Sequence, residues 1–239
     1  MINILILASG GGSNARAVVE YIQKSKYKMV VNMMAACNVR EEKAAVYGRM
    51  KKLGVNTAHI PSPGQDFSSL RFLLDFGFNG LKFDLIVMAG YMRIIPADIA
   101  EEYNILNIHP SVLPFAHKGS MDAYKDAFAA GSARTGCTVH RVIPEVDAGP
   151  VLAQIGFDIP DEIMRAGDLD LLKQVGLAHE HALYPEIALR EAADCEEPLD
   201  MWAVQKRAQN ILLERRLPFT NTLIPGTGAV FKIWNQKGR

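Results

Sequence analysis

The chain has 239 residues, of which 49% are hydrophobic and 22% charged, a balance typical of a globular protein with one large core or two small lobes. Its 26 Lys and Arg residues equal its 26 Asp and Glu residues, so no overall positive field would gather nucleic acid, and we expect no nucleic-acid partner. The three cysteines are far apart and form no C-x-x-C pair, which favours a reducing compartment and therefore a cytoplasmic protein.

The first apolar run, residues 2–8, is too short to span a bilayer and lacks a basic leader. It continues into glycine-rich sequence and not into a small-residue cleavage site. We therefore interpret it as a buried strand and expect no membrane association.

Short apolar runs alternate with longer amphipathic stretches over the first 110 residues. Such runs are typical of strands buried on both faces, and the stretches between them have helical character. The alternation predicts an α/β fold with a doubly wound, mostly parallel sheet, as in Rossmann-like proteins. The expected strands are residues 2–8, 29–37, 57–60, 85–89 and 105–108, and the expected helices are residues 14–23, 41–53, 68–80 and 96–103.

The pattern changes after residue 110. Residues 137–143 and 151–157 predict an antiparallel strand pair in the C-terminal half. A helix with two apolar stripes is predicted over about 168–192, which indicates that it is well buried and that Pro185 kinks it. Further on we expect a basic amphipathic helix, a turn and a short apolar run over residues 202–216, 225–228 and 229–234.

A glycine-rich segment, SGGGSN at residues 9–14, separates the first expected strand from the first expected helix. Glycines there let the backbone approach a phosphate, and the helix N-terminus offers unpaired N–H donors. Ser13 is a candidate cap of that helix. The spacing matches neither the dinucleotide fingerprint nor Walker A, so a tight turn without a ligand is the alternative.

Asn107 and His109 lie at the end of an expected parallel strand, where open α/β sheets place their ligand crevice. Alternation along a strand places the two side chains on one face. An amide donor beside an imidazole suits stabilisation of an oxyanion and movement of a proton. The alternative is a structural histidine.

Asp147 lies in the loop 145–150 between the paired late strands. Its charge could raise the proton affinity of a nearby histidine, or its carboxylate could order a water for proton transfer. The alternative is a role in turn formation, which is common for Asp before small residues and Pro.

Arg93 lies in the segment GYMRII, residues 90–95, directly after an expected strand. The guanidinium could bind a carboxylate or phosphate, and the apolar neighbours could receive a flat ring. A plain surface arginine is the alternative.

Four further polar residues interrupt apolar sequence. His140 is a candidate pocket wall or a core imidazole. Glu180 lies in an apolar stripe, where an unpaired carboxylate is costly, so either a ligand hydroxyl or amine or a salt bridge at the helix end would explain it. His179 and His181 are two residues apart and diverge on a helix, so we expect no metal site.

These segments, in this order, resemble the glycinamide ribonucleotide formyltransferases, a folate-dependent family, over roughly residues 1–192. Each motif alone is weak, but the set is specific. The family's motifs are a Gly-rich loop with Ser-Asn, G-[FY]-M-R, N-I-H-P-S-x-L-P, T-x-V-H, D-x-G-P and E-H-x-x-Y-P, and they match residues 10–14, 90–93, 107–114, 138–140, 147–150 and 180–185.

The resemblance implies formyl transfer from 10-formyltetrahydrofolate to the amine of glycinamide ribonucleotide, a step of purine biosynthesis, by direct attack. It implies a catalytic trio of Asn107, His109 and Asp147. The substrate phosphate and ribose would contact Gly11, Gly12, Ser13, Asn14 and Glu180. The folate would contact Met92, Arg93, Ile94, Ile95, Asn107, His140, Val146 and Asp147.

The implied organisation is a formyltransferase domain over residues 1–192, with a phosphate-binding half up to residue 110 and a folate-site half after it. Residues 193–239 are then an extension of unknown role, and the partners are small molecules, with the protein a monomer or homodimer. The loop 115–121 departs from the family pattern, which puts its substrate contacts in doubt.

Three alternatives remain open at this point. The acceptor could be a nucleotide-linked amino sugar, or the methionyl group of an initiator tRNA, for which the C-terminal segment is too short and the charge too balanced. The third alternative is a protein that binds nucleotide or folate without catalysis. The trio Asn107, His109 and Asp147 argues against it, because binding alone does not require these three residues.

Overall fold

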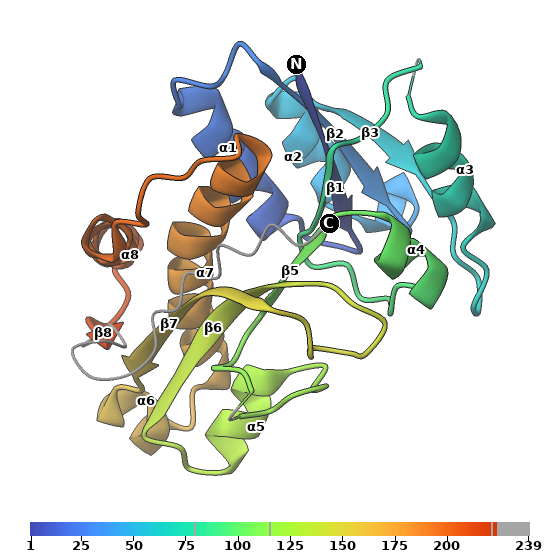
Figure 1. Ribbon diagram of the computed structural model, residues 1–239. Helices are drawn as coiled ribbons and strands as arrows, with labels where there is room; N and C mark the ends of the chain where they lie inside the picture. The colour runs from blue at the N-terminus through green and yellow to red at the C-terminus, as the bar shows by residue number, and fades with distance from the viewer. Residues whose placement is uncertain (79, 115, 221, 224–239) are drawn as a thin grey trace.

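The computed structural model describes residues 1–78, 80–114, 116–220 and 222–223 (Figure 1). Its strands are β1 (Ile2–Ala8), β2 (Val31–Cys37), β3 (Asn56–His59), β4 (Leu85–Met88), β5 (Ile105–His109), β6 (Arg134–Arg141), β7 (Val151–Asp158) and β8 (Thr222–Leu223). They form one sheet in the order β3-β2-β1-β4-β5-β6-β7-β8. The first five strands pair in parallel, and β6, β7 and β8 pair antiparallel. The predicted fold class is confirmed.

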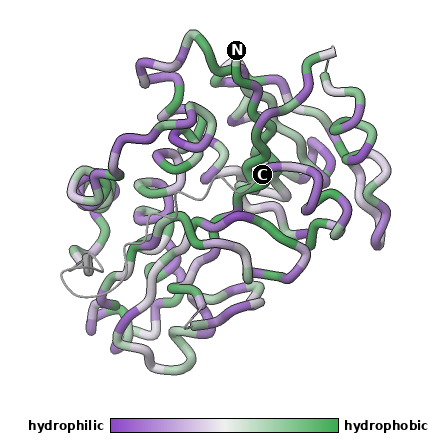
Figure 2. Tube along the Cα trace, viewed as in Figure 1, coloured by the Kyte–Doolittle hydropathy of each residue, from purple (hydrophilic) through white to green (hydrophobic). Residues whose placement is uncertain are grey.

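Helices cover both faces of the sheet (Figure 1). They are α1 (Ser13–Lys24), α2 (Val46–Lys52), α3 (Ser68–Phe76), α4 (Ala97–Glu102), α5 (Ala123–Ala129), α6 (Asp161–Ala166), α7 (Leu169–Ala192) and α8 (Met201–Glu214). α1, α2 and α7 pack on one face with Ile4 and Ile6 of β1, whereas α3 and α4 pack on the other with Leu5 and Leu7. Burial on both faces explains the continuous apolar run of β1, which Figure 2 shows as a hydrophobic segment below the N-terminus.

Two predicted helices have wrong boundaries. The helix expected over residues 41–53 is divided, because Ala44 is extended and separates a 3-10 turn at Glu41–Lys43 from α2. The helix expected over residues 68–80 ends at Phe76. Its C-cap, Gly77, has φ 69°, and an added Cβ would lie 2.2 Å from the carbonyl oxygen of Leu81.

Smaller differences affect the other elements. β2 begins at Val31 and not at Met29, whose side chain is exposed, and β6 begins three residues before the expected position 137. The helices α5 and α6 and the strand β8 were not predicted. The turn and apolar run expected over residues 225–234 lie outside the described residues.

The helix α7 is the buried element that joins the two halves of the protein. It continues through Pro185, where the expected kink stays a prediction, and fourteen of its residues are buried. The single hydroxyl hydrogen of Tyr184 is shared between the carbonyl oxygens of Met88 on β4 and Leu106 on β5, at 3.1 Å and 3.0 Å. Of the described helices, none has the length and apolar character needed to cross a bilayer.

The helix α8 belongs to the predicted extension and packs against α7. Its apolar side is buried through Val204, Ala208 and Leu212. Arg207 donates to the carbonyl oxygen of Ala182 at 2.7 Å and pairs with Glu186 at 3.2 Å. The predicted amphipathic helix over residues 202–216 is thus present as α8, and it covers the outer side of α7.

Two histidines of α7 predict how stability responds to acid. Burial lowers the pKa of His179 to about 4, and burial together with nearby arginine charges lowers the pKa of His181 to about 3. Between pH 6.5 and about pH 4 the two histidines are protonated in the unfolded chain but neutral in the folded chain. The free energy of unfolding therefore decreases as the pH falls through this window. Each histidine contributes up to about 1.4 kcal/mol per pH unit in that window.

We expect the free energy of unfolding, measured in urea, to fall steeply between pH 6.5 and pH 4.5. His179→Gln should flatten this slope even if it lowers the stability at pH 7.5. An equal slope for the variant and the original protein would contradict the assignment.

Candidate active site

A cavity of about 290 Å³ opens at the carboxyl edge of the sheet, where ligand sites of parallel α/β folds lie. Its size is close to the lower end of the range for small-molecule sites. It brings together most of the residues that the sequence singled out. The lining residues predicted from sequence are Asn14, Met92, Arg93, Ile94, Ile95, Asn107, His109, His140, Val146, Asp147 and Glu180.

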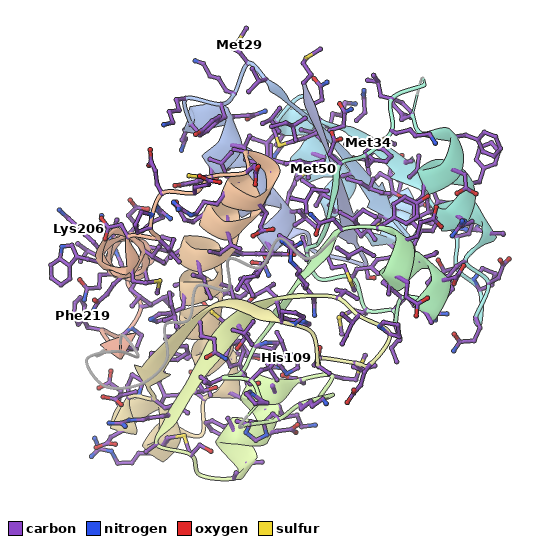
Figure 3. All side chains as sticks on the ribbon, viewed as in Figure 1. Met29, Met34, Met50, His109, Lys206 and Phe219 are labelled. Atoms are coloured by element: carbon purple, nitrogen blue, oxygen red, sulfur yellow. The ribbon has the colours of Figure 1, made fainter. Side chains whose placement is uncertain are left out.

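β5 presents Asn107 and His109 to this cavity, as the alternation of strand side chains predicts. The pairing of β5 with β6 places Asn107 opposite His140. His109 is only 4% exposed, and Figure 3 shows it beside β6 in the interior of the molecule.

Both ring nitrogens of His109 face oxygen acceptors. Nδ1 lies 3.2 Å from Oδ2 of Asp147, and Nε2 donates to the carbonyl oxygen of His117 at 3.0 Å. Only the imidazolium form can donate in both directions. Burial nevertheless lowers the pKa of His109, and the charge of Asp147 offsets only part of that effect. The expectation that Asp147 raises the proton affinity of a histidine is met in direction, but burial outweighs it.

Asp147 is held by several donors. Its backbone has a positive φ of 51°, and its carboxylate accepts the Gly119 N–H at 3.0 Å. Burial alone would raise the pKa of Asp147, but the neighbouring imidazoles of His140 and His109 and the Gly119 N–H hold that pKa below its usual value. The carboxylate is therefore ionised at neutral pH, beside His109.

His140 positions the amide of Asn107. Its Nδ1–H donates to the carbonyl oxygen of Arg141 at 2.9 Å, which leaves the Nε2 lone pair to accept from Nδ2 of Asn107 at 3.3 Å. His140 is 2% exposed and lines the cavity, so both sequence interpretations, core imidazole and pocket wall, describe it.

Glu180 lies deep in the same cavity and is held by neutral donors. It accepts from Nδ2 of Asn14 at 2.7 Å and from the hydroxyl of Tyr124 at 3.0 Å. Burial raises the pKa of Glu180, and these two hydrogen bonds oppose the rise in part. Among the described residues no cation pairs with it, so the helix-end salt bridge considered for Glu180 is absent there.

Tyr124 is a site residue that sequence reasoning missed. It lies in α5, a short helix that no strong pattern announces. Gly176 of α7 gives the ring its space, because an added Cβ there would lie 2.2 Å from the ring carbon Cζ. In the sequence, the signal for a close contact at this place is Gly176 itself, a glycine inside a long buried helix.

The glycine-rich loop begins α1 differently from the prediction. Gly12 is the N-cap residue with φ 68°, and Ser13 is the first helical residue, so the expected cap by Ser13 is wrong. A Cβ on Gly12 would lie 2.5 Å from Cγ2 of Val46, which leaves no room for a side chain. The hydroxyl of Ser9 accepts the Met92 N–H at 2.8 Å and so ties this loop to residues 90–95.

The wall expected to receive folate is apolar and partly open. Met92 and Ile94 are exposed, and the guanidinium of Arg93 lies 5.7 Å from the centre of the Phe67 ring. From the departing loop, Gly119, Ser120 and Met121 line the cavity, and Lys118 beside them pairs with Glu145 at 2.8 Å. Within the described residues, no group of three or more His, Cys, Asp or Glu side chains is arranged to bind a metal.

Residues 2–188 match the formyl transferase family. The chain belongs to this family. It is 32% identical over 209 residues to the chloroplastic phosphoribosylglycinamide formyltransferase of Arabidopsis thaliana, which covers 81% of this chain and 65% of that protein. It is 31% identical over 192 residues to the trifunctional purine biosynthetic protein adenosine-3 of Homo sapiens, covering 76% of this chain. This formyl transferase spans only 17% of the length of that human relative.

Solved structures of the family are similar in fold. The glycinamide ribonucleotide transformylase 1 of Symbiobacterium toebii superposes with a TM-score of 0.68 at 28% identity, over 81% of this chain and 89% of that one. The phosphoribosylglycinamide formyltransferase of Brucella melitensis gives a TM-score of 0.65 at 31% identity, over 83% and 98%. This formyl transferase therefore shares its overall fold with both structures.

The loop geometry predicts that two glycines respond differently to alanine. Gly12→Ala introduces a clash with Val46 at a left-handed backbone position and should lower the free energy of unfolding by about 1–3 kcal/mol. Gly10→Ala is the matched control, because nothing lies within 4 Å of its added Cβ. Urea unfolding of both variants checks this, and equal stability of the two would count against the loop geometry.

Proposed function

We propose that the protein transfers the formyl group of 10-formyltetrahydrofolate to the amine of glycinamide ribonucleotide. The observation that carries the proposal is the contact of His109 with the Asp147 carboxylate, 3.2 Å away, on the wall of a cavity that also contains Asn107 and Glu180. Membership of the formyl transferase family and the names of the similar proteins support this chemistry and this acceptor.

The two substrates would contact different elements around the cavity. The phosphate of the ribonucleotide would lie at Gly11, Gly12, Ser13 and Asn14, because the first N–H groups of a helix have no partner within the helix. Glu180 would accept hydrogen bonds from the ribose hydroxyls. The folate ring would lie against Met92, Arg93, Ile94, Ile95, His140 and Val146, an apolar wall with a few polar groups.

The reaction would begin when the neutral amine attacks the formyl carbon and the carbonyl oxygen becomes an oxyanion. Asn107 donates to that oxygen through an amide that His140 already orients. The new C–N bond then remains while the bond to the folate nitrogen breaks. A water held by Asp147 carries the proton from the attacking nitrogen to the leaving nitrogen, and no covalent enzyme intermediate is needed.

His109 would take up a proton from solvent as the oxyanion forms and release it to solvent when the oxyanion collapses to the new formamide carbonyl. Burial disfavours the imidazolium in the free protein, whereas a second negative charge next to the ring favours it. In the free protein the Nε2–H of His109 donates to the carbonyl oxygen of His117. In the reaction this N–H would donate to the oxyanion, which would take the place of that carbonyl as the acceptor.

His109→Ala should lower turnover on the order of 100-fold or more, the usual loss for one oxyanion donor. Absorbance measures the conversion of the 10-formyl donor to tetrahydrofolate. His59→Ala, at the exposed end of β3 and outside this cavity, is the control and should keep normal turnover. Near-normal turnover of His109→Ala would refute the assignment, and tight folate binding without transfer to any amine by the original protein would refute the proposed function.

Glu180→Gln should raise the KM for glycinamide ribonucleotide about 10-fold or more with little change in the KM for the folate. The amide has one acceptor oxygen where the carboxylate has two, and Asn14 and the ribose would compete for it. Tyr124→Phe removes one donor to Glu180 without changing the carboxylate, and it should have a smaller effect. A parallel rise in both KM values for Glu180→Gln would show a general disturbance of the cavity.

A further inference from the structure

An arginine from the C-terminal extension reaches the region of the glycine-rich loop. Arg215 follows the last residue of α8, and its Nη2 donates to Nδ1 of His181 on α7 at 2.7 Å. Its position lies outside residues 2–188, the part that matches the formyl transferase family.

Two other arginines approach the same place from different elements. Arg49 of α2 has its Nη1 4.0 Å from the position of a Cβ added to Gly11 in the loop. Arg16 lies in the first turns of α1. Besides burial, the charges of Arg215, Arg16 and Arg49 all lower the pKa of His181, so the three guanidiniums gather around this ring.

The positive charge of this cluster is only partly balanced. Arg16 pairs with Glu20 at a long 3.7 Å, and Glu20 and Glu214 act on Arg215 from a distance. No carboxylate of the described residues forms an ion pair with Arg49 or Arg215. Three cations within one region, two of them without such a partner, favour an anion.

His181 adds a donor to the cluster. Because its Nδ1 accepts from a guanidinium that always donates, the neutral ring carries its hydrogen on Nε2. That Nε2–H is buried and has no hydrogen-bond partner among the described residues, although the residue is only 7% exposed. A buried unpaired donor needs an acceptor, which an anion supplies.

We propose that Arg215, together with Arg16 and Arg49, binds the phosphate of the ribonucleotide substrate at the glycine-rich loop. The ligand class is a phosphate monoester, which arginines bind through paired, charge-assisted hydrogen bonds. The inference rests on the proposed function and gives the C-terminal extension a part in substrate recognition. α8 then completes a subsite that the glycine loop begins.

Arg207 allows this role to be separated from a structural one. It lies on the same helix and holds α8 against α7 through Ala182 and Glu186. Removing Arg207 weakens the attachment of α8 without removing a cation that acts on His181. Arg207→Met is therefore the matched control for Arg215→Met.

The first measurement is steady-state kinetics of the full chain. Arg215→Met should raise the KM for glycinamide ribonucleotide about 10-fold or more, with kcat and the KM for 10-formyltetrahydrofolate within about two-fold. Arg215→Lys should recover part of the loss, and Arg207→Met should change the KM for the ribonucleotide little. Arg49→Met, which leaves the contacts of α8 intact, should show the same selective rise and serves if Arg215→Met fails to fold.

The second measurement needs no turnover. Inorganic phosphate, compared with chloride at equal ionic strength, should raise the Tm of the original protein, and the shift should be reduced for Arg215→Met and Arg49→Met but kept for Arg207→Met. An unchanged KM and an unchanged phosphate shift in both variants would overturn the proposal, as would equal effects of Arg207→Met. If the original protein transfers no formyl group, the proposed function fails, while the phosphate shift still decides whether the cluster binds phosphate.

Discussion

Parallel pairing of β1, β4 and β5 brings the carboxyl ends of three strands to one edge of the sheet, and the candidate site depends on that constraint. The glycine loop follows β1, the segment 90–95 follows β4, and Asn107 and His109 end β5. The antiparallel strands β6 and β7 then bring Asp147 back over the same edge from a position forty residues later in the chain. The glycine loop, the segment 90–95 and the end of β5 therefore meet because the registers of β1 with β4 and of β4 with β5 are fixed.

At that edge, burial and nearby charge have opposite effects on the pKa of His109. Burial disfavours the imidazolium of His109, while Asp147 and the surrounding acceptors favour it. A group balanced in this way changes its protonation when one more charge arrives, which suits a step that creates an oxyanion. The buried carboxylate of Glu180 is stabilised differently, because two neutral donors, Asn14 and Tyr124, bind it and no cation among the described residues pairs with it.

Sequence reasoning predicted the parts of the site that local patterns determine. A period of two places Asn107 and His109 on one face, and a strand followed by glycines places the loop 9–14 at the sheet edge. The start of α1 was predicted less well, because the left-handed conformation of Gly12 replaced a cap by Ser13. The roles of the site residues and the domain boundary at residue 192 stay predictions.

The residues that were missed depend on contacts across the fold. Tyr124 reaches Glu180 only because α5 packs beside α7, and α5 is too short for a clear helical period. Arg215 reaches His181 only because α8 folds back on α7, which no spacing in the chain announces. The supporting contacts in this formyl transferase are therefore long-range, as is the contact of Asp147 with His109, whereas the shared face of Asn107 and His109 follows a local rule.

Ser9 joins the glycine loop to the loop after β4. Its N–H donates to the carbonyl of Gly90 at 3.0 Å, and its hydroxyl accepts from the Met92 N–H at 2.8 Å. These two hydrogen bonds hold the backbones of the two loops together, although in the proposed function each loop would contact a different substrate. A substitution at position 9 would disturb both loops at once, which restricts how independently the two proposed subsites can change in sequence.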